Sequence, residues 1–165
     1  MEVITPGNED FSQFYVLVPW MTSYSFQVMA CSDVNILLAR IPGRIETDYY
    51  EVRISPAGIN KVEIRKNGLI KKEAILSSSM LHCSRYSIFW VSWEGGLIAV
   101  GEEYRMDSAI MLKWQDPSPH SILALHVSTA NENIGRWKFS HPQGNGNCSL
   151  YSLSEVVTSC FELHA

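Results

Sequence analysis

The sequence has no long apolar run, no cluster of basic residues and no region dominated by charge of one sign. No uninterrupted apolar stretch approaches the roughly 18 residues that would suggest a transmembrane helix, so we expect no membrane insertion. The 13 Lys and Arg residues are outnumbered by 17 Asp and Glu residues, which gives a formal net charge of −4. A mildly acidic chain without a basic run is a poor candidate for binding phosphate backbones, so we expect no nucleic-acid partner.

Sequence motifs for metals, cofactors and covalent catalysis are also missing. The chain has no C-x-x-C pair and no His at zinc-finger spacing from a Cys, so we expect no metal site. It has neither the G-x-G-x-x-G motif nor a P-loop, and it lacks the G-x-S-x-G elbow of serine hydrolases. His82 and Cys83 are sequence neighbours that point to opposite faces of a strand, so they do not form a catalytic dyad. We therefore expect no cofactor and assign no catalytic residue. Residues 1–7 also lack the basic and apolar segments of a signal peptide.

The residues that are present favour short strands in one domain. Apolar residues make up 46% of the 165 residues, enough for the core of a single domain over residues 1–165. Apolar and polar residues alternate with the period of half-buried strands. We expect strands at 24–30, 33–39, 49–54, 61–65, 88–93, 97–100, 111–114, 122–127 and 136–139. Asn67-Gly68 is a strong hairpin signal, and Gly95-Gly96 marks a second turn. The pattern predicts an all-β fold, an antiparallel β-sandwich or jelly roll of roughly nine to ten strands. Residues 154–161 fit a short helix or a last strand.

The four cysteines allow three disulfide pairings. They are Cys31, Cys83, Cys148 and Cys160. We favour a Cys148–Cys160 pair, because the short segment between them would staple the C-terminal tail; the alternative is four buried free thiols. Asn147-Cys148-Ser149 matches the N-glycosylation pattern, which matters only in a secreted chain. It favours an extracellular location slightly, and a cytoplasmic one stays open.

Aromatic residues supply candidates for stacking on a sugar ring. Trp93, Trp114 and Trp137 lie in strand-like segments and are expected in the core. Trp90 lies three residues before Trp93 and so points to the opposite face of its strand. We therefore take Trp90, together with Trp20 in a loop-like segment, as candidates for an exposed sugar-binding ring.

Charged residues alternate with apolar ones on two neighbouring strand segments. Glu51 and Arg53 share one face, and Glu63 and Arg65 share a face of the next segment. Cross-strand ion pairs are one interpretation. The other is a concave face that binds sugar hydroxyls, with arginine as donor and glutamate as acceptor. Our candidate ligand-binding residues are therefore Glu51, Arg53, Arg65, Trp90 and Trp20.

One further acidic pair invites a catalytic interpretation. Glu102 and Glu103 are adjacent, and two carboxylates are what a glycoside hydrolase requires. A solvated strand edge explains the same pair without any chemistry.

The combined segments resemble a known family. The residues that carry the likeness include 24–30, 33–38, 49–54 and the block Phe89–Gly101, followed by Trp114 and Trp137. They resemble the farnesoic acid O-methyltransferase-type domain over about 14–139, which leaves 140–165 as a C-terminal extension. The family name implies methyl transfer to a sesquiterpenoid acid, whereas this chain lacks the glycine-rich turn that usually holds such a methyl donor.

The sequence leads to a non-catalytic recognition module that binds a glycan or a protein partner. One alternative is a farnesoic acid O-methyltransferase-like enzyme. The other is a structural or oligomerisation domain of a larger extracellular protein. The oligomeric state stays open.

Overall fold

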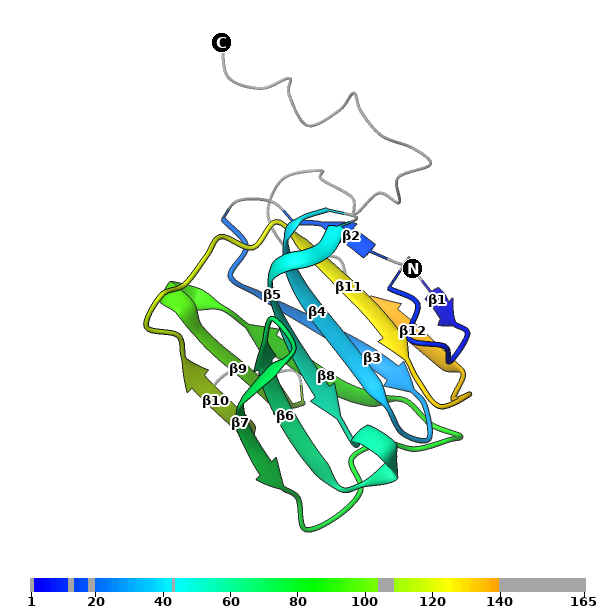
Figure 1. The fold of residues 1–165 in the computed structure, drawn as a ribbon. Helices are drawn as coiled ribbons and strands as arrows, with labels where there is room; N and C mark the ends of the chain where they lie inside the picture. Colours follow the sequence, from blue (N-terminus) through cyan, green and yellow to red (C-terminus); the bar gives the residue numbers. More distant parts are fainter. Residues whose placement is uncertain (1, 12–13, 18–19, 43, 104–108, 140–165) are drawn as a thin grey trace.

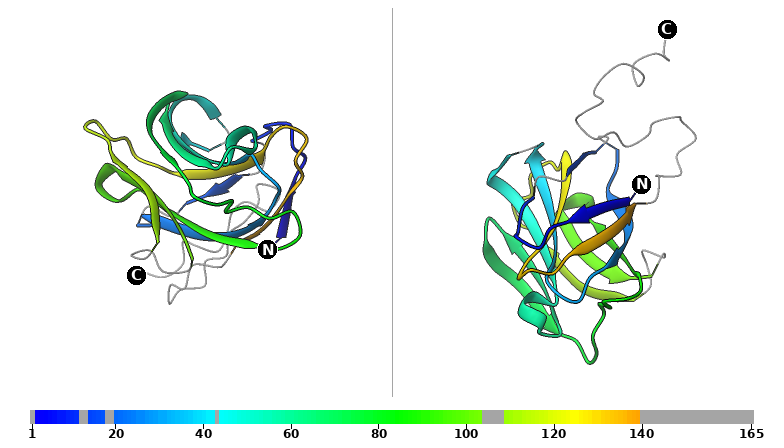
Figure 2. Two further views of the ribbon diagram at one scale, coloured as in Figure 1. Left: turned by 90° about the horizontal axis from the view of Figure 1, so that it is seen from below. Right: turned by 90° about the vertical axis from the view of Figure 1, so that its right-hand side faces the viewer.

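The domain is a sandwich of two antiparallel sheets. The structure, a computed structural model, describes residues 2–11, 14–17, 20–42, 44–103 and 109–139. Two six-stranded sheets pack face to face (Figure 1), and the second viewing direction shows the two layers edge-on (Figure 2). The predicted all-β antiparallel sandwich is confirmed. The described residues contain twelve strands rather than nine or ten.

Each sheet combines a run of consecutive strands with strands from distant parts of the chain. Sheet A has the order β1 (Glu2–Thr5), β12 (Gly135–Phe139), β3 (Ser23–Met29), β8 (Ser87–Ser92), β9 (Leu97–Glu102), β10 (Ile110–Gln115). Sheet B has the order β2 (Phe14–Val16), β11 (Ala124–Thr129), β4 (Val34–Ile41), β5 (Arg44–Ile54), β6 (Lys61–Lys66), β7 (Leu69–Ile75). Two short 3-10 helices, η1 (Pro56–Gly58) and η2 (Glu94–Gly96), lie in the connections.

The turns form where the sequence predicts them. Asn67 and Gly68 join β6 to β7 with φ values of 51° and 79°, which is the left-handed conformation that a tight hairpin requires. Gly95 and Gly96 lie in η2 between β8 and β9, and both also have positive φ. These residues are therefore accounted for by chain reversal.

The core lies between the two sheets and is built by strand alternation. In β5, the side chains of Tyr50, Val52 and Ile54 are fully buried between the sheets. Trp137 of β12 is also fully buried, and its indole N–H donates to the Thr5 hydroxyl at 3.0 Å. Burial of a large ring whose polar atom is hydrogen-bonded stabilises such a core, and truncation of the ring to alanine costs about 3–5 kcal/mol. Trp93 and Trp114 also pack in or against this core, as predicted.

Asp33 ties three loops together at one end of the sandwich. Its carboxylate is 4% exposed and accepts hydrogen bonds from the Ala57 amide at 2.6 Å and from the Asn131 side chain at 2.8 Å. Asn133 and Ser32 donate to the second carboxylate oxygen at 3.3 and 2.5 Å. The loop after β3, the loop holding η1 and the loop after β11 therefore meet on one side chain.

A disulfide joins Cys31 and Cys83. Cys31 follows β3 and Cys83 precedes β8, so the bond links the ends of two neighbouring strands of sheet A. The alternative of four free thiols is therefore wrong. The proposed Cys148–Cys160 pair, the Asn147 glycosylation pattern and the segment 154–161 lie outside the described residues. Within the described part of the chain, no helix is long and apolar enough to cross a membrane.

Candidate functional site

The outward face of sheet B carries the charged residues that the sequence singled out. Because Val52 of β5 and Ile64 of β6 point into the core, the side chains that alternate with them point away from sheet A. Glu51 lies opposite Arg65 in the β5–β6 register, and Arg53 lies opposite Glu63. The four charges therefore form a two-by-two arrangement in which every neighbour, along and across the strands, has the opposite sign.

Ion pairs in this arrangement run along the strands. The Arg65 guanidinium contacts Glu63 Oε2 through Nε at 2.8 Å and through Nη2 at 2.6 Å. Arg53 Nε lies 3.0 Å from Glu51 Oε1, although its N–H is not aligned with that oxygen. The sequence favoured pairing across the strands; the structure corrects this, because each arginine folds back onto the acid two residues before it.

The acids of this face are buried and the cations partly cover them. The side chains of Glu51 and Glu63 are only 5% and 2% exposed. Lys61, Arg53 and Arg65 keep 20 to 22% of their side chains exposed. Lys61 Nζ also reaches the second oxygen of Glu63 at 2.5 Å. Among these five side chains, the ones that meet the solvent are therefore hydrogen-bond donors with positive charge.

Burial and pairing act differently on the two carboxyl groups. Burial raises the pKa of Glu51, and the nearby Arg53 and Arg65 guanidinium groups offset this only in part. Burial also acts to raise the pKa of Glu63, but hydrogen bonds from Lys61 and Arg65 outweigh it and hold that pKa below its ordinary value. Glu63 is thus ionised at neutral pH and forms ion pairs with Lys61 and Arg65.

Part of the outward face of sheet B is covered by the chain itself. Phe11 packs on Leu37, Ala39 and Ala124, which lie on the outward side of β4 and β11. His126 Nδ1 lies 3.0 Å from the Phe11 carbonyl oxygen, and burial lowers the pKa of this imidazole. The open part of the face is therefore the part formed by β5, β6 and β7.

Tyr49 is an aromatic residue at this open part that the sequence interpretation did not select. It precedes Glu51 and Arg53 on the same face of β5 and is half-buried beside the Phe11 cluster. Its hydroxyl approaches the Gly68 turn, where a Cβ would lie 3.5 Å from the oxygen. The alternation of Tyr49, Glu51 and Arg53 is the sequence signal that places this ring on the charged face.

The structure separates the two tryptophan candidates from the arginines. Trp90 belongs to β8 of sheet A and is 1% exposed, so the expected exposed ring is not found. The reason is Gly101, its register partner on β9, which has no side chain and leaves space for the indole. Trp20 is 77% exposed, as expected, but it lies before β3 of sheet A. Glu51, Arg53 and Arg65 are the candidates that come together.

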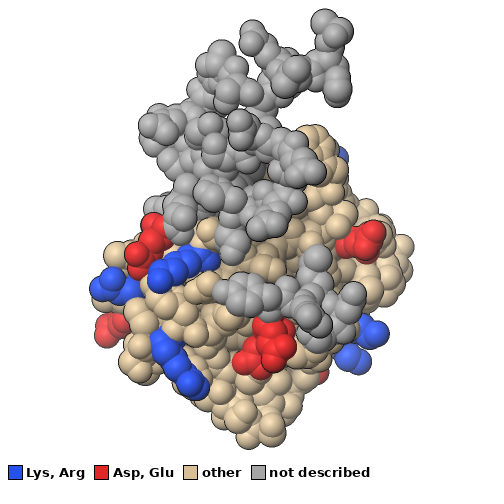
Figure 3. All heavy atoms as spheres, turned by 180° about the vertical axis from the view of Figure 1, so that it is seen from behind, with Lys and Arg blue, Asp and Glu red and all other residues tan. Residues whose placement is uncertain are grey.

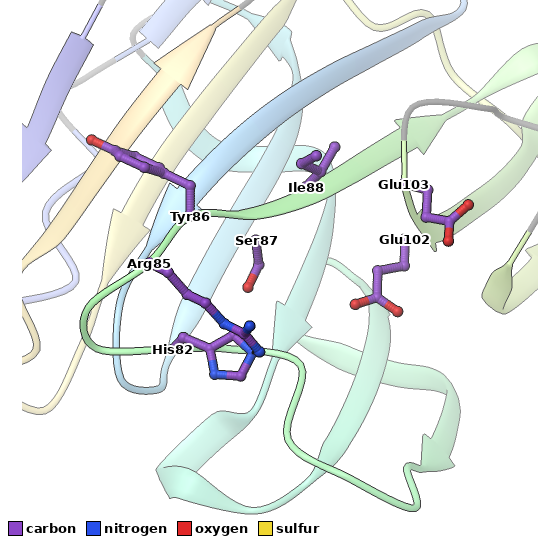
Figure 4. A pocket seen from close by; sticks show the side chains of 7 residues that line it. All are labelled: His82, Arg85, Tyr86, Ser87, Ile88, Glu102 and Glu103. Atoms are coloured by element: carbon purple, nitrogen blue, oxygen red, sulfur yellow. The ribbon is translucent and has the colours of Figure 1, made fainter.

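A cavity of about 220 Å³ lies beside sheet A. Figure 4 shows Glu102 and Glu103 on one side of it, with His82 and Arg85 on the other. His82 Nε2 and Arg85 Nη2 are 2.5 Å apart. Burial raises the pKa of Glu102, and the neighbouring Glu103 carboxylate raises it further. The cavity brings the two acids predicted from the sequence next to two basic side chains.

A second cavity, of about 380 Å³, opens at the end of the sandwich near η2. Met21, Trp93 and Ile122 give it an apolar lining, and His120 borders it. The His120 ring stacks on Tyr50 with centroids 4.3 Å apart, and burial lowers the pKa of this imidazole. The Tyr50 hydroxyl donates to Asp116 at 2.6 Å, so this histidine packs against a buried polar network of the loop after β10.

Charges on the opposite side of the molecule are more dispersed. Seen from behind, the Lys, Arg, Asp and Glu residues of the described surface lie in small groups of both signs (Figure 3). Within the described residues, no group of three or more His, Cys, Asp or Glu side chains could hold a metal ion.

Comparison with solved structures finds proteins of similar fold. A carbohydrate-binding module, CBM66 from Bacillus subtilis, aligns with a TM-score of 0.50 and 12% identity over 72% of this chain and 71% of that one. Bacillus licheniformis β-glucanase gives a TM-score of 0.48 and 13% identity over 76% of this chain, which spans 66% of the glucanase. Caenorhabditis elegans galectin LEC-6 gives a TM-score of 0.46 and 12% identity over 85% of this chain and 96% of the galectin. At these identities the likeness concerns the fold alone, a sandwich of two antiparallel sheets.

Comparison at the level of sequence is consistent with the resemblance noted above. No curated protein matches this chain. The family model described as farnesoic acid O-methyltransferase matches residues 7–143, which includes every described strand from β2 to β12. The chain therefore belongs to the farnesoic acid O-methyltransferase domain family.

Proposed function

We propose that this domain is a non-catalytic recognition module that binds a glycan on the open outward face of β5 and β6. The observation that carries the proposal is the set of partly exposed cations, Arg53, Arg65 and Lys61, held in place by two buried carboxylates. Side chains fixed in this way lose little conformational entropy when they bind a ligand.

The chemistry of this face suits a saccharide. A guanidinium presents N–H donors in a fixed planar fork, which matches oxygen atoms on neighbouring carbons of a sugar ring. Tyr49, half-buried on the same face of β5, offers an aromatic surface beside the arginines. An aromatic surface next to fixed donors is the combination with which protein sites recognise the apolar and polar sides of a sugar.

The fold and the disulfide are compatible with this proposal. The domain shares the sandwich architecture of CBM66, which is named as a carbohydrate-binding module. The Cys31–Cys83 disulfide favours an oxidising compartment, where cell-surface and secreted glycans are met. We therefore propose an extracellular location.

The family name alone does not supply a methyl-transfer mechanism. The conspicuous glycine pair, Gly95 and Gly96, is used by the turn between β8 and β9, and Gly96 packs against Pro119. Family membership carries the fold, whereas an activity has to be argued from a site. The site with the most developed geometry is the charged face of sheet B.

A glycan array followed by calorimetry tests the proposal. We expect the wild-type domain to bind a subset of glycans, and Arg53→Ala and Arg65→Ala each to weaken binding at least tenfold, because a charge-assisted hydrogen bond is lost. Arg136→Ala is the matched control, since Arg136 is an exposed arginine on β12 of sheet A. Circular dichroism verifies that each variant is folded.

Two results would argue against the proposal. Equal loss in Arg136→Ala would place the glycan elsewhere, and an array without any bound glycan would favour a protein partner. In that case, sedimentation at several concentrations tests the alternative of an oligomerisation domain. Incubation with S-adenosylmethionine and farnesoic acid tests the enzymatic alternative directly.

A further inference from the structure

We infer that the glycan bound by the outward face of sheet B is anionic, carrying a carboxylate or a sulfate group. This inference rests on the proposed function and adds the chemical class of the ligand. It follows from which polar atoms of the face are already engaged and which remain available.

The acceptors at the centre of this face are engaged by the protein itself. Glu63 uses one oxygen for Lys61 and the other for Arg65, and it is 2% exposed. Glu51 places one oxygen 3.0 Å from Arg53 and is 5% exposed. Neutral sugars present hydroxyl groups that both donate and accept, and a site for them usually offers acceptors as well as donors. Here the centre of the face offers donors, and the exposed acceptors, Glu9 and Glu73, lie at its rim.

Those donors lie within the span of one or two sugar rings. Lys61 and Arg65 flank Glu63 on β6, and Arg53 lies opposite Glu63 on β5. Residues two apart on one face of a strand are separated by about 7 Å, and neighbouring strands by about 5 Å. Three positive groups within this area match a ligand that carries acidic groups on neighbouring sugars.

Two carboxylates of the chain already occupy the rim of this area. Glu9 Oε1 lies 3.8 Å from Arg53 Nη1, and Glu73 Oε2 lies 3.4 Å from Lys61 Nζ. Both acids are about half exposed, at 53% and 52%, so these contacts are weak and easily exchanged. They show that Arg53 and Lys61 can form ion pairs with carboxylates that reach them from the solvent side. A ligand carboxylate or sulfate would take the same positions.

This competition gives the inference a test in which affinity increases. We expect the double variant Glu9→Gln/Glu73→Gln to bind an acidic glycan up to about fivefold tighter than the wild type, because two competing anions are removed. Both residues are exposed, so folding is not at risk. Glu132→Gln is the matched control, since Glu132 is an exposed acid in the loop after β11.

Calorimetry with matched neutral and acidic probes measures the selectivity. The probes are lactose against 3′-sialyllactose, and dextran against dextran sulfate. We expect the acidic member of at least one pair to bind at least tenfold tighter than the neutral one, and binding to weaken as salt is raised. Arg53→Ala and Arg65→Ala should each abolish most of this difference.

The possible results separate this inference from the proposed function. Tight binding of neutral glycans that depends on Arg53 and Arg65 would overturn the anionic class and keep the glycan site. Binding of acidic probes that is unchanged in both arginine variants would show nonspecific attraction and overturn the inference. Failure of all probes and of the glycan array would overturn both.

Discussion

Charged residues are arranged differently on the outward face of sheet B and in the cavity lined by Glu102 and Glu103. On sheet B, acids and cations two residues apart share a face, and each buried carboxylate is held by a neighbouring cation. Beside sheet A, Glu102 and Glu103 are consecutive, and they lie across a cavity from Arg85 without an ion pair among the described residues (Figure 4). Spacing along a strand therefore decides whether charges become a fixed network or stay separate.

The pKa directions follow this difference. Cations that donate to Glu63 hold its pKa low, so its charge contributes to stability at neutral pH. The pKa of Glu102 is raised by burial and by the adjacent Glu103, so its charged form is disfavoured in the folded protein. The negative charge of Glu63 thus stabilises the fold, whereas the negative charge of Glu102 does not.

Removal of the disulfide should destabilise sheet A most. The Cys31→Ser/Cys83→Ser variant frees a chain segment with a sequence separation of 52 residues. We expect the free energy of unfolding to fall by about 4 kcal/mol, because the unfolded chain regains the entropy that the closed loop removes. Urea unfolding with and without reductant measures this. If reductant shifts the wild type and the double variant equally, another disulfide is responsible.

Neutralising the central acid of sheet B should have a large effect. Glu63→Gln leaves Lys61 and Arg65 close together without their anion, and we expect a loss of about 3 kcal/mol. Glu102→Gln is the matched change on sheet A, and it should alter stability by less than about 0.5 kcal/mol. Chemical unfolding of the two variants tests the comparison. Equal losses would show that Glu63 is not an anchoring charge.

A methyl group at Gly101 should disturb sheet A to an intermediate degree. Gly101→Ala places a Cβ against the buried Trp90 indole, and overpacking of this kind costs about 2 kcal/mol. Gly95→Ala serves as the control, because nothing lies within 4 Å of a Cβ there and only its left-handed backbone, with φ of 58°, opposes the change. The near-ultraviolet signal of the tryptophans should change in Gly101→Ala alone.

Opposite pH dependences of Glu51 and Glu63 should give the smallest effect. Because the pKa of Glu51 is raised, the folded state binds its proton more tightly than the unfolded chain does. The free energy of unfolding therefore falls as pH rises above 4.5, the ordinary pKa of this group. Over that range the stability of Glu51→Gln should increase relative to that of the wild type. Glu63 contributes stability above 4.5 that is lost as pH falls through its lowered pKa. Glu63→Gln should therefore differ least from the wild type in acid. Unfolding curves from pH 3 to 7 that run parallel for all three proteins would contradict this assignment.

Strands with a long alternating pattern were predictable from the sequence, and short edge strands were not. β3 alternates over seven residues with one buried side, and β5 alternates the apolar Tyr50, Val52 and Ile54 with the charged Glu51 and Arg53. β1 and β2 have four and three residues and form edges of sheets A and B, so their pattern is too short to identify. Their pairing depends on β12 and β11, which lie more than 100 residues later in the chain.

The candidate site was predictable in its charges and not in its surroundings. Shared faces for Glu51 with Arg53, and for Glu63 with Arg65, follow from spacing alone. The burial of Trp90 depends on Gly101, a residue on another strand, and no local pattern indicates which residue lies across from it. Likewise, coverage of β4 and β11 by Phe11 comes from a distant part of the chain.

The Asp33 carboxylate has a consequence for how this domain can diversify. Three connections from both sheets are fastened to a single acid, so we expect a change in the length of one loop to disturb the hydrogen bonds of the other two. Insertions that create new specificities should therefore be tolerated better in the remaining connections. Evolutionary variation in recognition should thus be concentrated away from Asp33, with that pole of the sandwich kept as a fixed base.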